Sequence, residues 1–149
     1  LLSGRNEVHD EGQAAIELEM IADHEVEEGY PFHIKKEENP MVVDPIEIIR
    51  GVVLDLTKGI SPSKISGKFH RTIASLIIET CGVIRSKERM NRVVLSGGVF
   101  QNIFLLSLVT EGLKKSGFEI YTHHLIPAND GGISLGQAII GHMRLFQCA

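Results

Sequence analysis

The ten residues 93–102 constrain the fold of this chain more than any other segment. Residues 93–95 are apolar and mostly β-branched, which predicts a short buried strand. Gly97 and Gly98 then predict a tight turn, and an apolar pattern of helical period begins directly after them. The segment therefore predicts a strand, a glycine turn and the start of a helix.

A unit of this kind is suited to holding an anion or the edge of a nucleotide. Glycines allow a ligand to approach the backbone closely, and the first amides of a helix lack intrahelical partners, so we expect them to point outward as donors. The segment matches neither the dinucleotide-binding fingerprint nor a P-loop. From these residues alone, ligand binding and a plain tight connection are equally good interpretations.

Length and charge limit the possible partners. The chain has 149 residues, which suits one domain with its own hydrophobic core. The sequence contains no internal repeat, low-complexity segment or linker, so we expect residues 1–149 to form a single domain. The net charge is −4 and lysines and arginines are not clustered, which argues against a nucleic-acid partner. We therefore expect a small molecule or a protein as partner.

The sequence carries no sign of a membrane or secreted protein. No apolar run approaches the roughly 18–20 residues that span a bilayer, and the first residues lack the layout of a signal peptide. Cys81 and Cys148 have no spacing typical of zinc, haem or a redox pair, so we expect reduced thiols in a cytoplasmic protein. Because the first residue is not methionine, we expect a piece of a longer polypeptide whose missing part lies upstream.

Periodicity and capping residues predict an alternation of helices and strands. Helices are expected over about 11–23, from 44–45 to 59, from 61–62 to about 87, from the first glycine turn to 117, and from a second glycine turn at 127–132 through 143. Strands are expected at 30–34, 41–43, 93–95 and 118–121, the first two joined by a charged turn. In the second helix we expect the buried face to consist of Ile46, Ile49, Val53 and Leu56.

This alternation indicates an α/β layer fold. If the last two strands run parallel, both glycine turns lie at their carboxyl ends, where such sheets collect ligands. Asp130 in the second turn could then hold a divalent metal or cap the last helix, and the residues alone favour the cap. His70 lies on the flank of an apolar helical stripe, which favours a packed or hydrogen-bonded side chain. His123 and His124 are not expected to bind one metal together, since adjacent residues of a strand point to opposite faces.

Four segments in matching order resemble the C-terminal region of the HypF carbamoyltransferases. They are residues 96–102, residues 127–133, residues 11–19 and the tripeptide at 68–70, so the resemblance extends from about 10 to 140. It implies the C-terminal lobe of a Kae1-like carbamoyltransferase domain. The implied fold is α/β, namely the second lobe of an actin-like ATPase of ribonuclease H-like fold, with a short mixed sheet flanked by several helices.

The resemblance also implies a function. The family uses carbamoyl phosphate and ATP to form carbamoyl-adenylate, and passes the carbamoyl group to the C-terminal cysteine of HypE during [NiFe]-hydrogenase maturation. Two alternatives stay open, a Kae1- or TsaD-like lobe for threonylcarbamoyl transfer to tRNA and a non-catalytic interaction module. We expect the isolated lobe to be inactive, and its apolar cut surface to favour self-association.

The family's site residues carry over by position. Gly12 and Glu17 are implied at the ribose of ATP or AMP, and the implied residues around base and phosphates are Ser96, Gly97, Gly98 and Asn102. Asp130 matches an aspartate that binds a divalent metal (Fe, Zn or Mg), which reverses the preference for a cap. The relatives also use a His-x-x-x-His pair in the first half of the domain, which this sequence lacks. The resemblance assigns no catalytic residue here.

Overall fold

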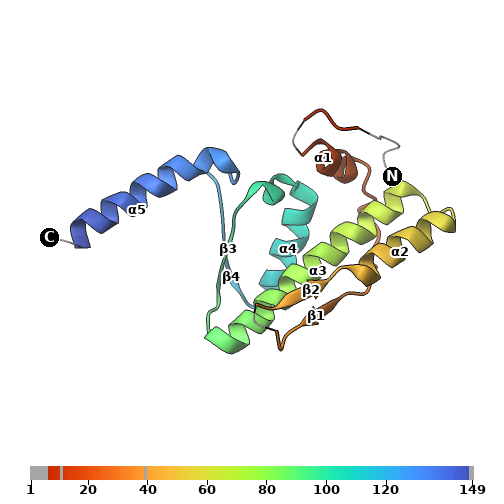
Figure 1. Ribbon diagram of the computed structural model, residues 1–149, viewed down its shortest axis with the longest axis horizontal. Coiled ribbons are helices and arrows are strands. Elements are labelled where there is room, and N and C mark those ends of the chain that lie inside the picture. The colour runs from red at the N-terminus through yellow and green to blue at the C-terminus, as the bar shows by residue number, and fades with distance from the viewer. Residues whose placement is uncertain (1–6, 11, 39, 148–149) are drawn as a thin grey trace.

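The structure is a computed structural model that describes residues 7–10, 12–38 and 40–147. Helices and strands alternate along this part of the chain (Figure 1). In order they are α1 (Gln13–Met20), β1 (His33–Lys35), β2 (Val42–Asp44), α2 (Ile46–Thr57), α3 (Pro62–Glu88), β3 (Arg92–Leu95), the 3₁₀ helix η1 (Gly98–Gln101), α4 (Ile103–Lys115), β4 (Glu119–Thr122), the 3₁₀ helix η2 (Asp130–Gly132) and α5 (Ile133–Gln147).

The strands pair into two small sheets. β1 and β2 form an antiparallel hairpin, as the charged turn between them predicted. β3 and β4 run parallel, with Arg92 opposite Glu119 and Leu95 opposite Thr122. The predicted parallel arrangement is confirmed, so both glycine turns leave the same edge of this sheet.

The main hydrophobic core lies between α3, α4 and one face of the β3–β4 sheet. Its buried members are Ala74, Leu95, Leu105, Val109, Leu113 and Phe118. A second, smaller core contains Tyr30, Ile48 and Ile65 and is closed by partly buried residues of α2 and α3. α4 packs along α3, but its first residue, Ile103, is exposed.

The predicted buried face of α2 is largely wrong. Ile48 is the buried residue of this helix, with Val52 and Leu56 packed beside it, whereas Ile46 and Val53 are half exposed. Ile49 is also exposed, at 57%. Apolar residues surround almost the whole helix, so periodicity alone cannot select the face that packs on α3.

α3 begins and ends as predicted, yet it buries polar residues. Ser61 caps it by accepting from the amide of Lys64 at 3.4 Å, and Pro62 occupies the first turn. Ser66 and Thr72 are almost fully buried because α2, α4 and the connection after α1 all pack on this helix. Thr72 Oγ1 accepts from the Tyr30 amide and donates to the Lys68 carbonyl, both at 2.7 Å, so its burial leaves no unpaired group.

The two ends of the described chain differ from the sequence prediction. α1 is shorter than the predicted helix over 11–23; residue 11 and Cys148 lie outside the described residues. α5 forms as predicted but projects from the body (Figure 1), and its large apolar residues from Ile133 to Phe146 are at least 44% exposed. None of the described helices is both long and apolar enough to cross a membrane.

Candidate functional site

The two glycine turns are joined by a backbone hydrogen bond. The amide of Gly97 donates to the carbonyl of Ala128 at 2.8 Å. Gly97 has φ 107° and ψ 157°, a conformation open to glycine but not to residues with a Cβ. η1 starts at the next residue, and its turn is closed by the Phe100 amide, which donates to the Gly97 carbonyl at 3.1 Å. The turns after β3 and β4 therefore form one connected surface.

A cleft of about 690 Å³ lies where this surface meets the start of α1. Its lining residues are Gly12, Ala15, Gly98, Val99, Gln101, Asn129, Asp130 and Gly131. Three of the predicted site residues, Gly12, Gly98 and Asp130, thus come together from segments that are far apart in the sequence. Ala15, which the sequence did not single out, lines the cleft because it lies one turn after Gly12 on α1.

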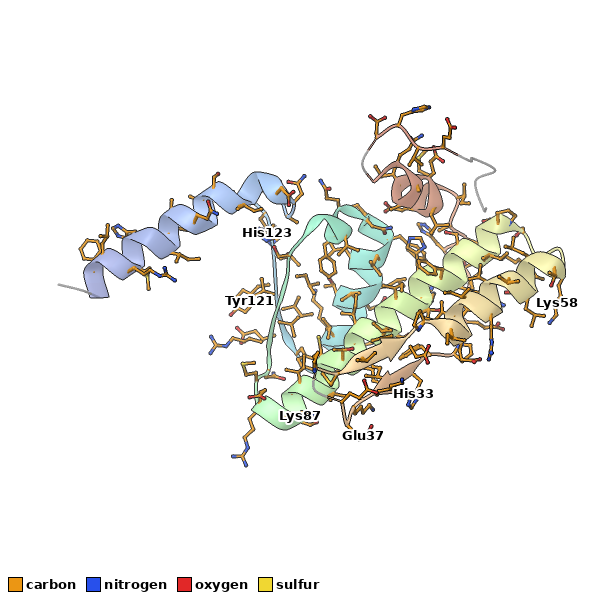
Figure 2. All side chains as sticks on the ribbon, in the orientation of Figure 1. His33, Glu37, Lys58, Lys87, Tyr121 and His123 are labelled. Atoms are coloured by element: carbon orange, nitrogen blue, oxygen red, sulfur yellow. The ribbon has the colours of Figure 1, made fainter. Side chains whose placement is uncertain are left out.

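Ser96 and Glu17 do not line this cleft. Ser96 follows β3, and its hydroxyl lies 2.9 Å from Nε2 of His123, which follows β4. Figure 2 shows His123 and Tyr121 on the side of β4 that faces away from α4. Glu17 lies on α1 and accepts from Nε2 of Gln13 at 2.9 Å. The predicted ribose contact would therefore have to form beside the cleft, along α1.

Asn102 separates η1 from α4 and serves as a helix cap. Its Oδ1 accepts from the Leu105 amide at 2.7 Å. The adjacent amide of Phe104 donates to Oε1 of Glu19, a residue of α1, at 3.1 Å. The prediction that the first amides of this helix point outward is wrong for these two, because side chains of the protein already accept from them. No local pattern could reveal Glu19, which is 85 residues away in sequence.

His70 is a hydrogen-bonded core residue, the interpretation that the sequence favoured. It is 4% exposed, and Nδ1 lies 2.8 Å from the carbonyl oxygen of Ser66. Its Nε2 lies 2.8 Å from Nδ2 of Asn102. His123 and His124 each contact a neighbouring hydroxyl, of Ser96 and Thr122 respectively.

The described residues do not form a complete metal site. Within them, no group of three or more histidine, cysteine, aspartate or glutamate side chains is arranged to hold an ion. Asn129, rather than Asp130, caps the second turn, because its Oδ1 accepts from the Gly131 amide at 3.1 Å. The carboxylate of Asp130 is therefore not used as a cap and could supply one oxygen ligand.

A separate polar cluster joins α2 to α3 away from the cleft. Oδ2 of Asp55 accepts from the Tyr30 hydroxyl at 3.0 Å and from Nζ of Lys68 at 3.1 Å. Burial alone would raise the pKa of Asp55, but the hydrogen bonds from Lys68 and Tyr30 and the charges of Lys68 and Lys58 outweigh it, so this pKa is lowered. The hydrogen bond to Asp55 raises the pKa of Lys68, and burial raises that of Tyr30. These pKa shifts are those of a hydrogen-bonded cluster that holds α2 to α3.

Several known proteins similar to this chain are carbamoyltransferases of the HypF type. The family model described as "Carbamoyltransferase, Kae1-like Domain, second subdomain" matches residues 1–137. Carbamoyltransferase HypF of Synechocystis sp. is 38% identical over 136 residues, which cover 90% of this chain and 17% of the relative. The probable carbamoyltransferase HypF of Methanocaldococcus jannaschii is 26% identical over 129 residues, or 87% of this chain and 16% of that protein.

Solved structures agree with these matches. A crystal structure of full-length HypF in the phosphate- and nucleotide-bound form is 48% identical, with a TM-score of 0.90, and the match covers 95% of this chain and 18% of that one. HypF of T. kodakarensis shares the fold, with a TM-score of 0.77 at 21% identity over 95% of this chain and 18% of that one. The chain thus spans less than a fifth of the length of the relatives it matches. It is a member of the HypF carbamoyltransferase family and corresponds to the second subdomain of the Kae1-like domain, with the α/β fold that the sequence predicted.

Proposed function

We propose that this chain is the C-terminal nucleotide-binding lobe of a HypF-like carbamoyltransferase. The complete enzyme would use carbamoyl phosphate and ATP to form carbamoyl-adenylate, then transfer the carbamoyl group to the C-terminal cysteine of a HypE-like protein during [NiFe]-hydrogenase maturation. The observation that carries the proposal is the cleft in which Gly12, Gly98 and Asp130 meet. The 48%-identical HypF whose structure is described as nucleotide-bound supports the same class of ligand.

Gly98 supports a ligand that lies against the backbone. Its φ is not positive, and a Cβ there would have only Oε1 of Gln101 nearby, at 4.0 Å. Packing within the described part of the chain thus gives no reason for a glycine at this position. A nucleotide that approaches the η1 backbone from the cleft would give one, because a side chain would occupy its place.

In the complete enzyme, Asp130 would provide one carboxylate ligand to a divalent metal, Fe, Zn or Mg. Such an ion neutralises phosphate charge during group transfer. The described residues contain no group of three or more histidine, cysteine, aspartate or glutamate side chains placed to hold an ion, so we expect remaining ligands from phosphate, water or other parts of the enzyme. The lobe is therefore expected to bind nucleotide weakly and not to catalyse alone.

We expect the purified chain to bind ATP, but not to form AMP from ATP in the presence of carbamoyl phosphate. In ¹⁵N-labelled protein, ATP at millimolar concentration should shift the amides of Gly98, Gln101 and Gly131 most strongly. Gly98→Val should weaken this binding about tenfold or more, because its side chain fills the ligand's place.

Gly82→Ala is the matched control, since a Cβ at this position of α3 meets nothing within 4 Å, and it should bind ATP like the parent chain. Robust AMP formation by the isolated chain would refute the half-site proposal. If ATP fails to bind even after the rest of a HypF enzyme is supplied, the non-catalytic interaction module becomes the better interpretation. Binding of tRNA in the same titration would favour the threonylcarbamoyl alternative.

We also propose that the isolated lobe associates with itself through α5. Met143, Leu145 and Phe146 are 56–75% exposed, and the main neighbour of α5 among the described elements is η2. Deleting residues 133–149 should abolish concentration-dependent association in sedimentation, while the melting temperature changes by less than about 2 °C, because few core contacts are lost. A monomeric parent chain, or a melting temperature lowered by more than about 5 °C, would contradict this.

A further inference from the structure

The hydrogen-bond partners of His70 within the described part of the chain are Ser66 and Asn102, and neither lines the cleft, but Asn102 directly follows η1. We propose that His70 is a positioning residue: it fixes the amide orientation of Asn102, and through it the turn formed by residues 97–101. This inference rests on the proposed function, because the turn at residues 97–101 has a binding role only if the cleft binds a nucleotide.

The hydrogen-bond partners define the state of the His70 ring. The Ser66 carbonyl can only accept, so Nδ1, at 2.8 Å, must carry a proton and donate. In the neutral ring Nε2 is then an acceptor, and it receives a hydrogen bond from Nδ2 of Asn102 at 2.8 Å. The oxygen of the same side-chain amide, Oδ1 of Asn102, then points to the backbone amide of Leu105, from which it accepts at 2.7 Å.

Reversing the Asn102 amide would bring its NH₂ group to the Leu105 amide, a contact between two donors. The cap would be lost. Asn102 also closes η1, since its own amide donates to the carbonyl of Val99 at 3.2 Å. Val99 and the preceding Gly98 line the cleft. The orientation of one side-chain amide therefore fixes where α4 starts and where the cleft wall ends.

The ring of His70 also contacts Phe104, whose backbone amide donates to a residue of α1. The Phe104 ring contacts two histidine rings: its centroid is 3.9 Å from that of His24, stacked, and 5.3 Å from that of His70. Glu19 of α1 binds the Phe104 amide. Gly12, the residue before α1, lines the cleft, so the hydrogen bond from Phe104 to Glu19 links the helix that follows Gly12 to the start of α4.

The proposal predicts the state of His70 in the unaltered chain. The ¹⁵N shifts of its imidazole should identify Nδ1 as protonated and Nε2 as an unprotonated acceptor. A proton on Nε2, or an imidazolium ring at neutral pH, would overturn the proposal, because Nε2 could then not accept from Asn102. This measurement needs neither a variant nor a nucleotide.

Two substitutions separate positioning from packing. In His70→Gln the amide oxygen can take the place of Nε2 and accept from Asn102, whereas in His70→Asn the shorter side chain reaches only the place of Nδ1. Hydrogen exchange of the Leu105 amide should be about fivefold faster in His70→Asn than in His70→Gln, the factor expected from loss of one side-chain cap. The apparent affinity for ATP should fall by about the same factor in His70→Asn.

Equal exchange rates at Leu105 in both variants would overturn the proposal. Equal losses of ATP affinity in two variants whose Leu105 amides exchange at different rates would also overturn the proposal. If ATP binds neither to the unaltered chain nor after the rest of a HypF enzyme is supplied, the proposed function fails, while the imidazole shifts and the Leu105 exchange still decide the role of His70. Should His70→Asn fail to fold, the imidazole shifts and retention of Leu105 protection in His70→Gln decide it.

Discussion

Gly67→Ala is expected to lower the free energy of unfolding by about 2–3 kcal/mol. Gly67 is buried in α3, and a Cβ built on it would lie 2.3 Å from the carbonyl oxygen of Asp23 and 3.2 Å from Cβ of Val26. The nearer contact is with backbone, which cannot rotate away as a side chain can. The segment after α1 would have to move off α3. Urea unfolding followed by circular dichroism measures the change.

Gly82→Ala in the same helix provides the control. A Cβ at Gly82 meets nothing within 4 Å, so the greater helix propensity of alanine should raise stability by about 0.5–1 kcal/mol. The two identical substitutions should therefore have opposite signs. If Gly67→Ala also stabilises the chain, the close packing of the segment around Asp23 on α3 does not exist in solution.

Asp55→Ala is expected to cost about 2–3 kcal/mol, because it leaves the partly buried Lys68 ammonium and the Tyr30 hydroxyl without their shared acceptor. The side chains of Asp55 and Lys68 are 13% and 23% exposed, so water compensates only in part. Glu47→Ala is the matched control. Its ion pair with Arg50 has side chains that are 51% and 73% exposed, and its loss should cost at most about 0.5 kcal/mol.

The Asp55 cluster also predicts a dependence on pH. The pKa of Asp55 is lowered in the folded chain, so its stabilising effect is fully present above the ordinary carboxyl pKa of 3.8. This contribution begins to fall near that value and disappears as the pH drops through the lower folded-state pKa. Asp55→Ala should therefore lose less stability than the parent chain on acidification. Parallel acid-unfolding curves for the two proteins would exclude this explanation.

The features that local chemistry determines were predictable from the sequence. In three such features the interacting groups lie within a few residues of one another, and the structure agrees with the prediction. They are the strand at 93–95, the two glycines after it and the cap at Ser61. The opening of α2 was only partly predictable. Asp44 accepts from the Ile46 amide at 3.0 Å, as an aspartate before a helix can, but nothing local indicated that Glu47 would pair with Arg50.

The arrangement behind the cleft could not be predicted in the same way. The contacts that hold Asn102 and Phe104 come from His70, 32 residues away, and Glu19, 85 residues away. No periodicity or motif encodes such separations, because they depend on how α1 and α3 pack against α4. The motif at 96–102 therefore indicated the place of the candidate site, but not which of its polar groups the protein itself would use.

α5 starts directly after η2, the turn whose Asp130 and Gly131 line the cleft. A helix of 15 residues is about 22 Å long, so a small rotation at that turn becomes a displacement of several ångströms at the far end of the helix. The far end of α5 would therefore move relative to the cleft whenever the backbone of η2 rotates. A surface that docks on α5 would therefore act on Asp130 and Gly131, the two residues of η2 that a ligand of the cleft would touch.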